Sequence, residues 1–213
     1  MIRFLTFSGL LALLLTSCGT YRYPNQLGVR NVNTTEVNTY FTDTAQAFVY
    51  RARVQAFQKD LNGNLLIKTI SPETHRIALV SDLGQTLFDM SIFPENHVLH
   101  FIMPDLDNKR VAKEIAFLFR TLTQRQFSQK AITFSGKQAF PVYVVNNAYY
   151  AFEERNLADI TSTKGKQELL LIHFDSIKQA IPGRIDIEHK RLPIRISLAL
   201  DREQSEIRTK PIS

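Results

Sequence analysis

The chain has 213 residues, 44% of them hydrophobic, which is enough to bury the core of one substantial domain. Its 26 Lys and Arg residues outnumber its 20 Asp and Glu residues, so the formal net charge is +6. The basic residues are scattered and do not alternate with aromatic residues, which argues against a nucleic-acid-binding protein but suits an anionic membrane surface. A single cysteine leaves no partner for a disulfide and no cysteine cluster for a metal.

The N-terminus combines one positive charge, a short apolar run and that single cysteine. Arg3 precedes residues 4–15, a run of 12 residues that is too short to span a bilayer but has the length of a signal-peptide core. The run ends in Leu-Thr-Ser-Cys-Gly, which resembles the lipobox of bacterial lipoproteins, where signal peptidase cuts before the cysteine and the thiol is lipidated. We predict a signal peptide over residues 1–17 and lipidation of Cys18. The alternative is an ordinary signal peptide with an accidental cysteine.

The segment after Cys18 is rich in Asn and Thr and has no hydrophobic period, so residues 18–43 are predicted to be a lipidated tether. No acidic residue stands beside the anchor, and by resemblance to lipoprotein sorting rules this permits delivery to the outer membrane. Several acyl chains on one residue anchor a protein firmly, at about 0.8 kcal/mol for each buried methylene. The remaining residues, 44–213, form the predicted domain.

After a possible short helix over residues 44–49, the chain shows the alternation of a β-strand. In FVYRARVQAF, residues 48–57, Phe48 and Tyr50 face one way while Arg51 and Arg53 face the other. Four further strands follow, which makes a meander of five. The turns that join them are predicted at Asp60-Leu61-Asn62-Gly63, Ser71-Pro72-Glu73, Ser81-Asp82-Leu83-Gly84 and Pro94-Glu95-Asn96.

An amphipathic helix of about four turns interrupts the strands after Pro104, with Asp105 or Asp107 as its N-cap. Its apolar stripe consists of Val111, Ile115, Leu118, Phe119 and Leu122. Strands then resume in the segments AITFS, PVYVV, AYYAFEE, ADITST, ELLLIHFDSI, RIDIEH and LPIRISLAL. About 11 strands with short connections predict a strongly curved antiparallel sheet.

Several strands carry apolar residues on both faces, whereas a sheet with one solvated face alternates cleanly. We therefore predict that the sheet encloses an apolar cavity, which the amphipathic helix plugs. An ordinary sandwich core remains the alternative. The predicted lining residues are Phe88, Met90, Phe101, Met103, Ile115 and Phe119.

The turn at residues 81–84 has a large apolar side chain at its tip, although turns are usually polar. Leu83 either folds back onto its own sheet or is exposed to a membrane or a ligand. Gly84 supplies the positive φ that such turns need.

Catalytic and metal-binding motifs are missing. The five histidines form no HxxxH or HExxH pattern, and His97 and His100 fall on a strand where positions i and i+3 point to opposite faces. No GxSxG elbow, glycine-rich phosphate loop or cysteine–histidine pair is present. Asp89, Asp175 and Asp186 are possible acids, but solvent exposure or pairing with arginine explains them better. We predict no enzyme, no metal and no cofactor, although a dispersed active site leaves no motif.

Two stretches, GNLLIKTISPETHRIALVSDLGQTLFDMSI and PGRIDIEHKRLPIRISLAL, resemble the LolB family of outer-membrane lipoproteins, which accept other lipoproteins from a periplasmic carrier. The resemblance covers about half of the chain and implies an incomplete barrel around a cavity for acyl chains. It also implies a LolA-like carrier as partner, and Leu83 matches a protruding leucine that the family needs to deposit lipoproteins. The chain lacks the family's tryptophans, and its tail beyond Leu200 is charged.

The leading hypothesis is therefore a lipid-anchored protein at the periplasmic face of the bacterial outer membrane, which binds acyl chains and receives or inserts lipoproteins. The alternative from another class is a structural accessory lipoprotein that docks on an envelope complex and needs no cavity.

Overall fold

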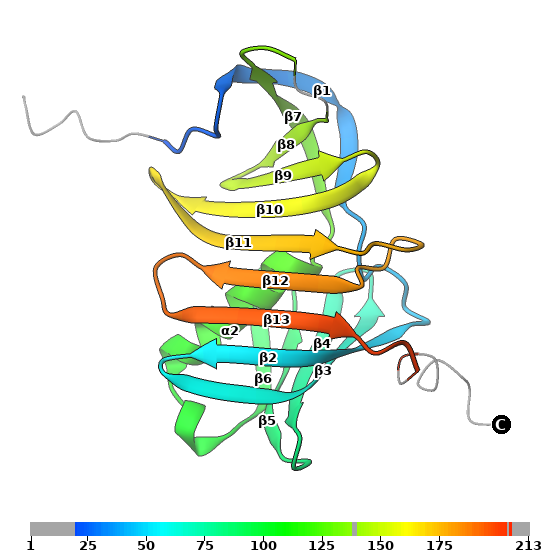
Figure 1. The fold of residues 1–213 in the computed structure, drawn as a ribbon, viewed down its shortest axis with the longest axis vertical. Coiled ribbons are helices and arrows are strands. Elements are labelled where there is room, and N and C mark those ends of the chain that lie inside the picture. Colours follow the sequence, from blue (N-terminus) through cyan, green and yellow to red (C-terminus); the bar gives the residue numbers. More distant parts are fainter. Residues whose placement is uncertain (1–19, 138–139, 204, 206–213) are drawn as a thin grey trace, which may run out of the picture.

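The structure is a computed structural model and describes residues 20–137, 140–203 and 205. In this part of the chain, 13 antiparallel strands form one curved sheet that does not close (Figure 1). The strands are β1 Gln26–Asn38, β2 Ala47–Ala56, β3 Lys59–Ser71, β4 Thr74–Ser81, β5 Thr86–Ile92, β6 His97–Ile102, β7 Gln126–Phe134, β8 Val142–Val145, β9 Ala148–Glu153, β10 Asn156–Lys164, β11 Gln167–Asp175, β12 Arg184–His189 and β13 Ile194–Leu200. The helices are the 3₁₀ turn η1, Pro104–Leu106, and α2, Lys109–Thr123.

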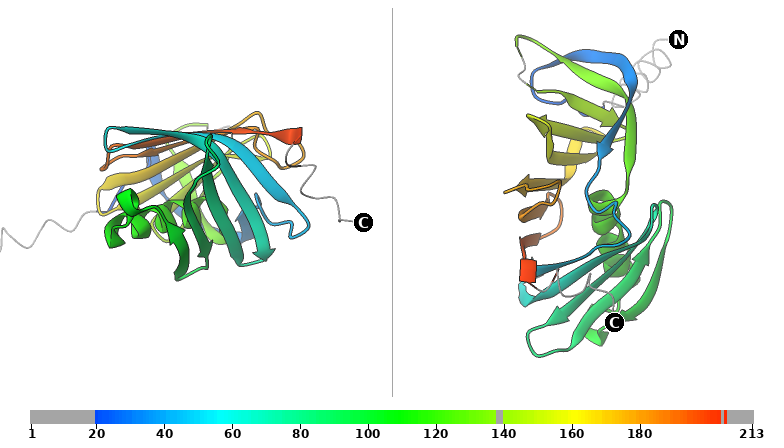
Figure 2. Two further views of the ribbon diagram at one scale, coloured as in Figure 1. Left: turned by 90° about the horizontal axis from the view of Figure 1, so that it is seen from below. Right: turned by 90° about the vertical axis from the view of Figure 1, so that its right-hand side faces the viewer.

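The strand order is β1-β7-β8-β9-β10-β11-β12-β13-β2-β3-β4-β5-β6. Two meanders, β2 to β6 and β7 to β13, are joined where the last strand pairs with β2. The edge strands β1 and β6 do not pair with each other. The sheet curls so that α2 lies against its inner face (Figure 2).

The alternation predicted for β2 is confirmed. Tyr50 and Ala52 are fully buried, while Arg51 and Arg53, which alternate with them, are exposed. Each inward residue of β2 lies beside an inward residue of β13, as Ala52 does beside Leu198. The five-strand meander and the later strands also form as predicted, because their apolar residues recur with the period of a pleated sheet.

The predicted helix forms as α2, and its buried stripe includes Leu118, Phe119 and Leu122. Its N-cap is Asn108, whose side chain accepts a hydrogen bond from the Arg110 backbone N–H at 2.8 Å. The prediction of Asp105 or Asp107 is wrong, because the 3₁₀ turn places the start of the α-helix beyond both residues.

The predicted tether does not extend over residues 26–38, because these residues form β1 and pair with β7. β1 is an edge strand, and much of its length is solvated, so it shows no hydrophobic period. The possible helix at residues 44–49 is absent, since β2 already begins at Ala47.

The first hairpin turn lies earlier than predicted. Phe57 and Gln58 form it, with φ values of 49° and 65°. Asn62 and Gly63 instead lie within β3, where a Cβ atom on Gly63 would be 2.1 Å from the carbonyl oxygen of Val80. Gly63 therefore allows β3 and β4 to approach closely and does not make a turn.

Candidate functional site

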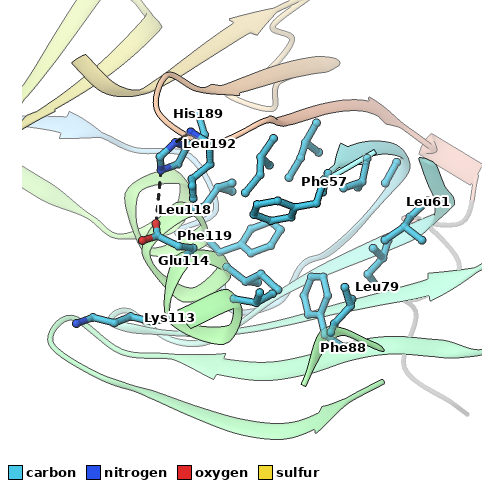
Figure 3. Close-up of a pocket in the computed structure, with 18 of the residues that line it drawn as sticks. Phe57, Leu61, Leu79, Phe88, Lys113, Glu114, Leu118, Phe119, His189 and Leu192 are labelled. Atoms are coloured by element: carbon cyan, nitrogen blue, oxygen red, sulfur yellow. Dashed lines mark hydrogen bonds and ion pairs between the residues drawn. The ribbon is translucent and has the colours of Figure 1, made fainter. Parts of the chain in front are cut away.

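An apolar pocket of about 460 Å³ lies between α2 and the inner face of the sheet (Figure 3). The sheet contributes residues from β2, β3, β4, β5, β12 and β13, and the helix contributes one side of its stripe. The residues that line it are Ala52, Val54, Ala56, Phe57, Leu61, Leu65, Leu79, Phe88, Leu106, Asn108, Arg110, Val111, Lys113, Glu114, Ile115, Leu118, Phe119, His189, Leu192, Ile194, Ile196 and Leu198.

Small side chains on β2 leave the space for this pocket. Ala52, Val54 and Ala56 alternate along the strand and share one face of the sheet. Their neighbours on β13, among them Ile196 beside Val54, continue the same apolar wall. Alanine at two of three positions leaves free volume between β2 and the helix.

The helix forms the opposite wall with residues spaced three and four apart. Val111, Ile115 and Leu118 line the pocket, and Phe119 packs against Phe88 of β5 with ring centroids 5.7 Å apart. Part of the apolar stripe of α2 therefore packs in the core, and the rest of the stripe faces the pocket.

Three of the six predicted lining residues line this pocket, namely Phe88, Ile115 and Phe119. Met90 does not, since it is fully buried in the core. Met103 packs against the core and Phe101 on β6 is 46% exposed.

The misplacement of Phe101 has a simple cause. Phe101 lies opposite Asp89 in the register of β5 and β6, so the two side chains share one face of the sheet. This is the solvated face, where Arg76 forms an ion pair with Asp89 at 2.7 Å. β6 is an edge strand, and its apolar residues remain partly exposed without facing the pocket.

Leu83 projects into solvent and is 87% exposed. Ser81 closes the turn by accepting a hydrogen bond from the Gly84 N–H at 2.9 Å, and Gly84 has the predicted positive φ of 78°. Both terminal nitrogens of the Arg51 guanidinium, Nη1 and Nη2, donate to the Asp82 carboxylate, which lowers the pKa of that carboxyl group. The turn is therefore fixed, and Leu83 does not fold back onto the sheet.

Basic side chains gather around the mouth of the pocket, although they are scattered in the sequence. The β2–β3 turn lies against the β12–β13 turn, where the Phe57 N–H donates to the Pro193 carbonyl at 3.2 Å. A neighbouring groove brings Lys164 of β10 beside Lys109 and Lys113 of α2. We name this group the basic edge: Lys59, Lys109, Arg110, Lys113, Lys164 and Lys190. Lys59 and Lys190 form ion pairs with Asp105 and Glu188. The same grooves are also lined by the carboxylates of Asp60, Glu95, Asp107 and Glu114.

One half-buried polar pair lies in the pocket wall and was missed by sequence reasoning. His189 is 5% exposed, and its Nε2 lies 3.5 Å from Glu114 Oε2 (Figure 3). A lone histidine at the end of a strand carries no motif, and Glu114 lies 75 positions away in the sequence (189 − 114). Only the tertiary structure brings the two residues together.

The other predicted polar candidates have structural partners. Asp186 pairs with Arg184 at 2.7 Å and accepts a hydrogen bond from Ser197. Within the described residues, no group of three or more His, Cys, Asp and Glu side chains is placed to hold a metal ion. Cys18 lies outside the described residues.

No family model matches this chain, and no curated protein matches it at a significant level. In the part of the chain that the structure describes, no helix has both the length and the apolar character needed to cross a membrane.

Proposed function

We propose that this protein is a lipid-anchored, LolB-like acyl-chain-binding protein that receives or inserts lipoproteins at the periplasmic face of the bacterial outer membrane. The observation that carries the proposal is the apolar pocket between α2 and the sheet. Its volume of about 460 Å³ falls within the range of roughly 300–1,000 Å³ that is typical of small-molecule sites. The resemblance in residues 63–92 and 182–200 supports the same proposal.

In this proposal α2 acts as the plug of the cavity. An acyl chain enters past Phe57, which is 48% exposed at the mouth, and lies between β2 and the helix. Each methylene that leaves water contributes about 0.8 kcal/mol. The pocket is lined mainly by apolar side chains, so it selects a hydrocarbon chain by burial alone and needs no catalytic group.

The basic edge directs the mouth of the pocket toward a membrane. Figure 1 places the first described residues, in blue, on the same side of the sheet as the β2–β3, β10–β11 and β12–β13 turns. Each unpaired Lys or Arg near an anionic surface adds about 1 kcal/mol of attraction, which the nearby carboxylates partly offset. The basic edge and the apolar mouth of the pocket together favour binding to a bilayer that contains anionic phospholipid.

Tyr21 shortens the tether. Its hydroxyl donates to Glu168 Oε1 at 2.7 Å, so the chain is already held on the sheet at that residue. Three peptide steps from Tyr21 to a lipidated Cys18 reach at most about 11 Å. The sheet therefore stays close to the bilayer, and Leu83 supplies an additional apolar contact for lipid or cargo.

The anchor is tested by fatty-acid labelling of producing cells. Cys18→Ala is expected to abolish incorporation, because the only thiol is removed. Labelling at the wild-type level would show that the lipobox interpretation is wrong.

The function itself is tested by transfer of a triacylated peptide from a LolA-like carrier to liposomes that contain anionic phospholipid. The lipid-anchored protein is expected to speed the appearance of the peptide in the liposomes. A rate equal to that without the protein would contradict the proposal.

The alternative function, a structural accessory lipoprotein, is favoured by one observation. Val98, Leu99 and Phe101 on the edge strand β6 are all partly exposed, and an open strand edge can add a strand from a partner. Under this alternative, a charge at Phe101 disrupts capture of an envelope partner, while acyl-chain binding is irrelevant.

A further inference from the structure

His189 has a hydrogen-bond donor that is buried in the wall of the pocket and has no partner among the described residues. Its Nδ1 accepts the backbone N–H groups of Arg191 and Leu192, at 3.2 and 3.0 Å, which stabilises the β12–β13 turn. Because Nδ1 is an acceptor, the neutral ring carries its proton on Nε2. The side chain is 3% exposed, and Nε2 has no hydrogen-bond partner in the described structure.

Glu114 faces this donor but does not satisfy it. Its Oε2 is 3.5 Å from Nε2, which is ion-pair distance without a hydrogen bond (Figure 3). Nε2 has almost no accessible surface, so a ligand reaches it only by displacing the Glu114 carboxylate. A buried donor without a partner is costly, so an acceptor that takes this place gains a hydrogen bond. The Glu114 side chain is 39% exposed and adds an acceptor directly beside the donor.

The surroundings of this pair are apolar. Leu118 and Leu192 lie beside it in the pocket wall, and Phe57 lies across the pocket (Figure 3). A ligand that fills the pocket with hydrocarbon therefore meets the Glu114 acceptor, and behind it the buried His189 donor, at a single place.

We propose that His189 and Glu114 form a head-group subsite for a neutral acyl lipid, one that carries an ester or amide carbonyl beside a hydroxyl or N–H group. This inference rests on the proposed function and specifies its ligand class. The carbonyl displaces the Glu114 carboxylate and accepts from His189 Nε2, and the hydroxyl or N–H donates to the displaced carboxylate. A free fatty acid fits worse, because its carboxylate repels the carboxylate of Glu114.

The test uses two fluorescent probes with the same acyl chain and dye, a monoacylglycerol and the free fatty acid, titrated into the protein at about pH 8, where histidine is neutral. The wild-type protein is expected to bind the monoacylglycerol about tenfold more tightly. Glu114→Gln is expected to reduce this preference to within about threefold, by improving the binding of the fatty acid.

Glu188→Gln is the matched control. Glu188 precedes His189 but lines a different groove, pairs with Lys190 at 2.6 Å, and has a side chain that is 38% exposed. The Glu188→Gln variant is expected to bind both the monoacylglycerol and the fatty acid with wild-type affinity. His189→Phe is expected to weaken the monoacylglycerol about tenfold, and its unfolding midpoint shows whether the turn survives.

Two outcomes overturn the inference in distinguishable ways. If the wild-type protein binds both probes equally, or if Glu114→Gln leaves their ratio unchanged, the pocket holds acyl chains but this pair is no head-group subsite. If neither probe binds, the proposed function fails together with the inference.

Discussion

Leu83 is the most exposed of the large apolar residues that the structure describes as exposed, and its position is fixed by its neighbours. Arg51 holds Asp82 and Ser81 closes the turn, so the leucine cannot retreat into the core. An exposed leucine contributes little to folding. Its value lies in what it can contact outside the protein, where full burial is worth about 1.5–3 kcal/mol.

Leu83→Glu is expected to change the free energy of unfolding by no more than about 0.5 kcal/mol. It is expected to slow transfer of a triacylated peptide to liposomes about tenfold, because a carboxylate resists entry into hydrocarbon. Ile70→Glu is the control, since Ile70 is 51% exposed on β3. Equal transfer by both variants would leave the β4–β5 turn without a role in delivery.

His75 illustrates a buried polar residue that belongs to the fold. Its ring nitrogen Nε2 donates to the Phe41 carbonyl at 2.8 Å, and Thr69 donates to the same oxygen at 2.6 Å. Burial is the main influence and lowers the pKa of His75, while the hydrogen bond to Phe41 raises it.

This lowered pKa makes stability depend on pH. In the unfolded chain His75 takes up a proton near pH 6.5, whereas in the folded chain it stays neutral to lower pH. The free energy of unfolding is therefore expected to fall as the pH drops below about 6.5. Denaturant midpoints measured between about pH 8 and 5 should show a smaller fall for His75→Gln than for the wild type. His97→Gln, on the edge strand, serves as the control and should keep the wild-type slope.

At the scale of the element, hydrophobic period predicts well wherever one face of a strand or helix is buried. β2 and α2 are examples, since Tyr50 and Leu122 fall on their buried faces as expected. Prediction from hydrophobic periodicity fails where a strand or turn is stabilised by its backbone and not by buried side chains. β1 joins the sheet with mostly solvated side chains, and the turn at Phe57 and Gln58 uses positive φ values at residues that carry no turn signature.

Gly63 is a second position where the local sequence misleads. An Asn-Gly pair usually indicates a turn, but here Gly63 lies where two strands approach each other closely. Gly63→Ala is expected to lower the free energy of unfolding by about 1–3 kcal/mol, since the new Cβ atom collides with the backbone of Val80. Gly28→Ala on β1 is the control, because the nearest atom, the Thr133 hydroxyl at 3.3 Å, belongs to a side chain that can rotate. Denaturant unfolding compares them, and equal losses would refute a special role for Gly63.

At the scale of the molecule, the sequence does not reveal which strands join the two meanders. The pairs β13–β2 and β1–β7 link residues far apart in the chain, and no local pattern specifies them. The pocket depends on the β13–β2 pair, which places His189 and β13 beside β2, and this explains why three lining residues were predicted and His189 was not. The candidate site is thus a property of the topology more than of any motif.

The central claim is that the pocket between α2 and β2 holds an acyl chain. Val54→Trp fills that pocket, while Arg53→Trp adds the same ring to the opposite, solvated face of β2. A fluorescent acyl probe is titrated into the wild type and both variants, whose unfolding midpoints are also measured. We expect Val54→Trp to weaken binding at least about tenfold with a small loss of stability, because free space accepts added volume, and Arg53→Trp to bind as the wild type does. Wild-type binding by a folded Val54→Trp protein, or no binding by the wild type, would contradict the claim.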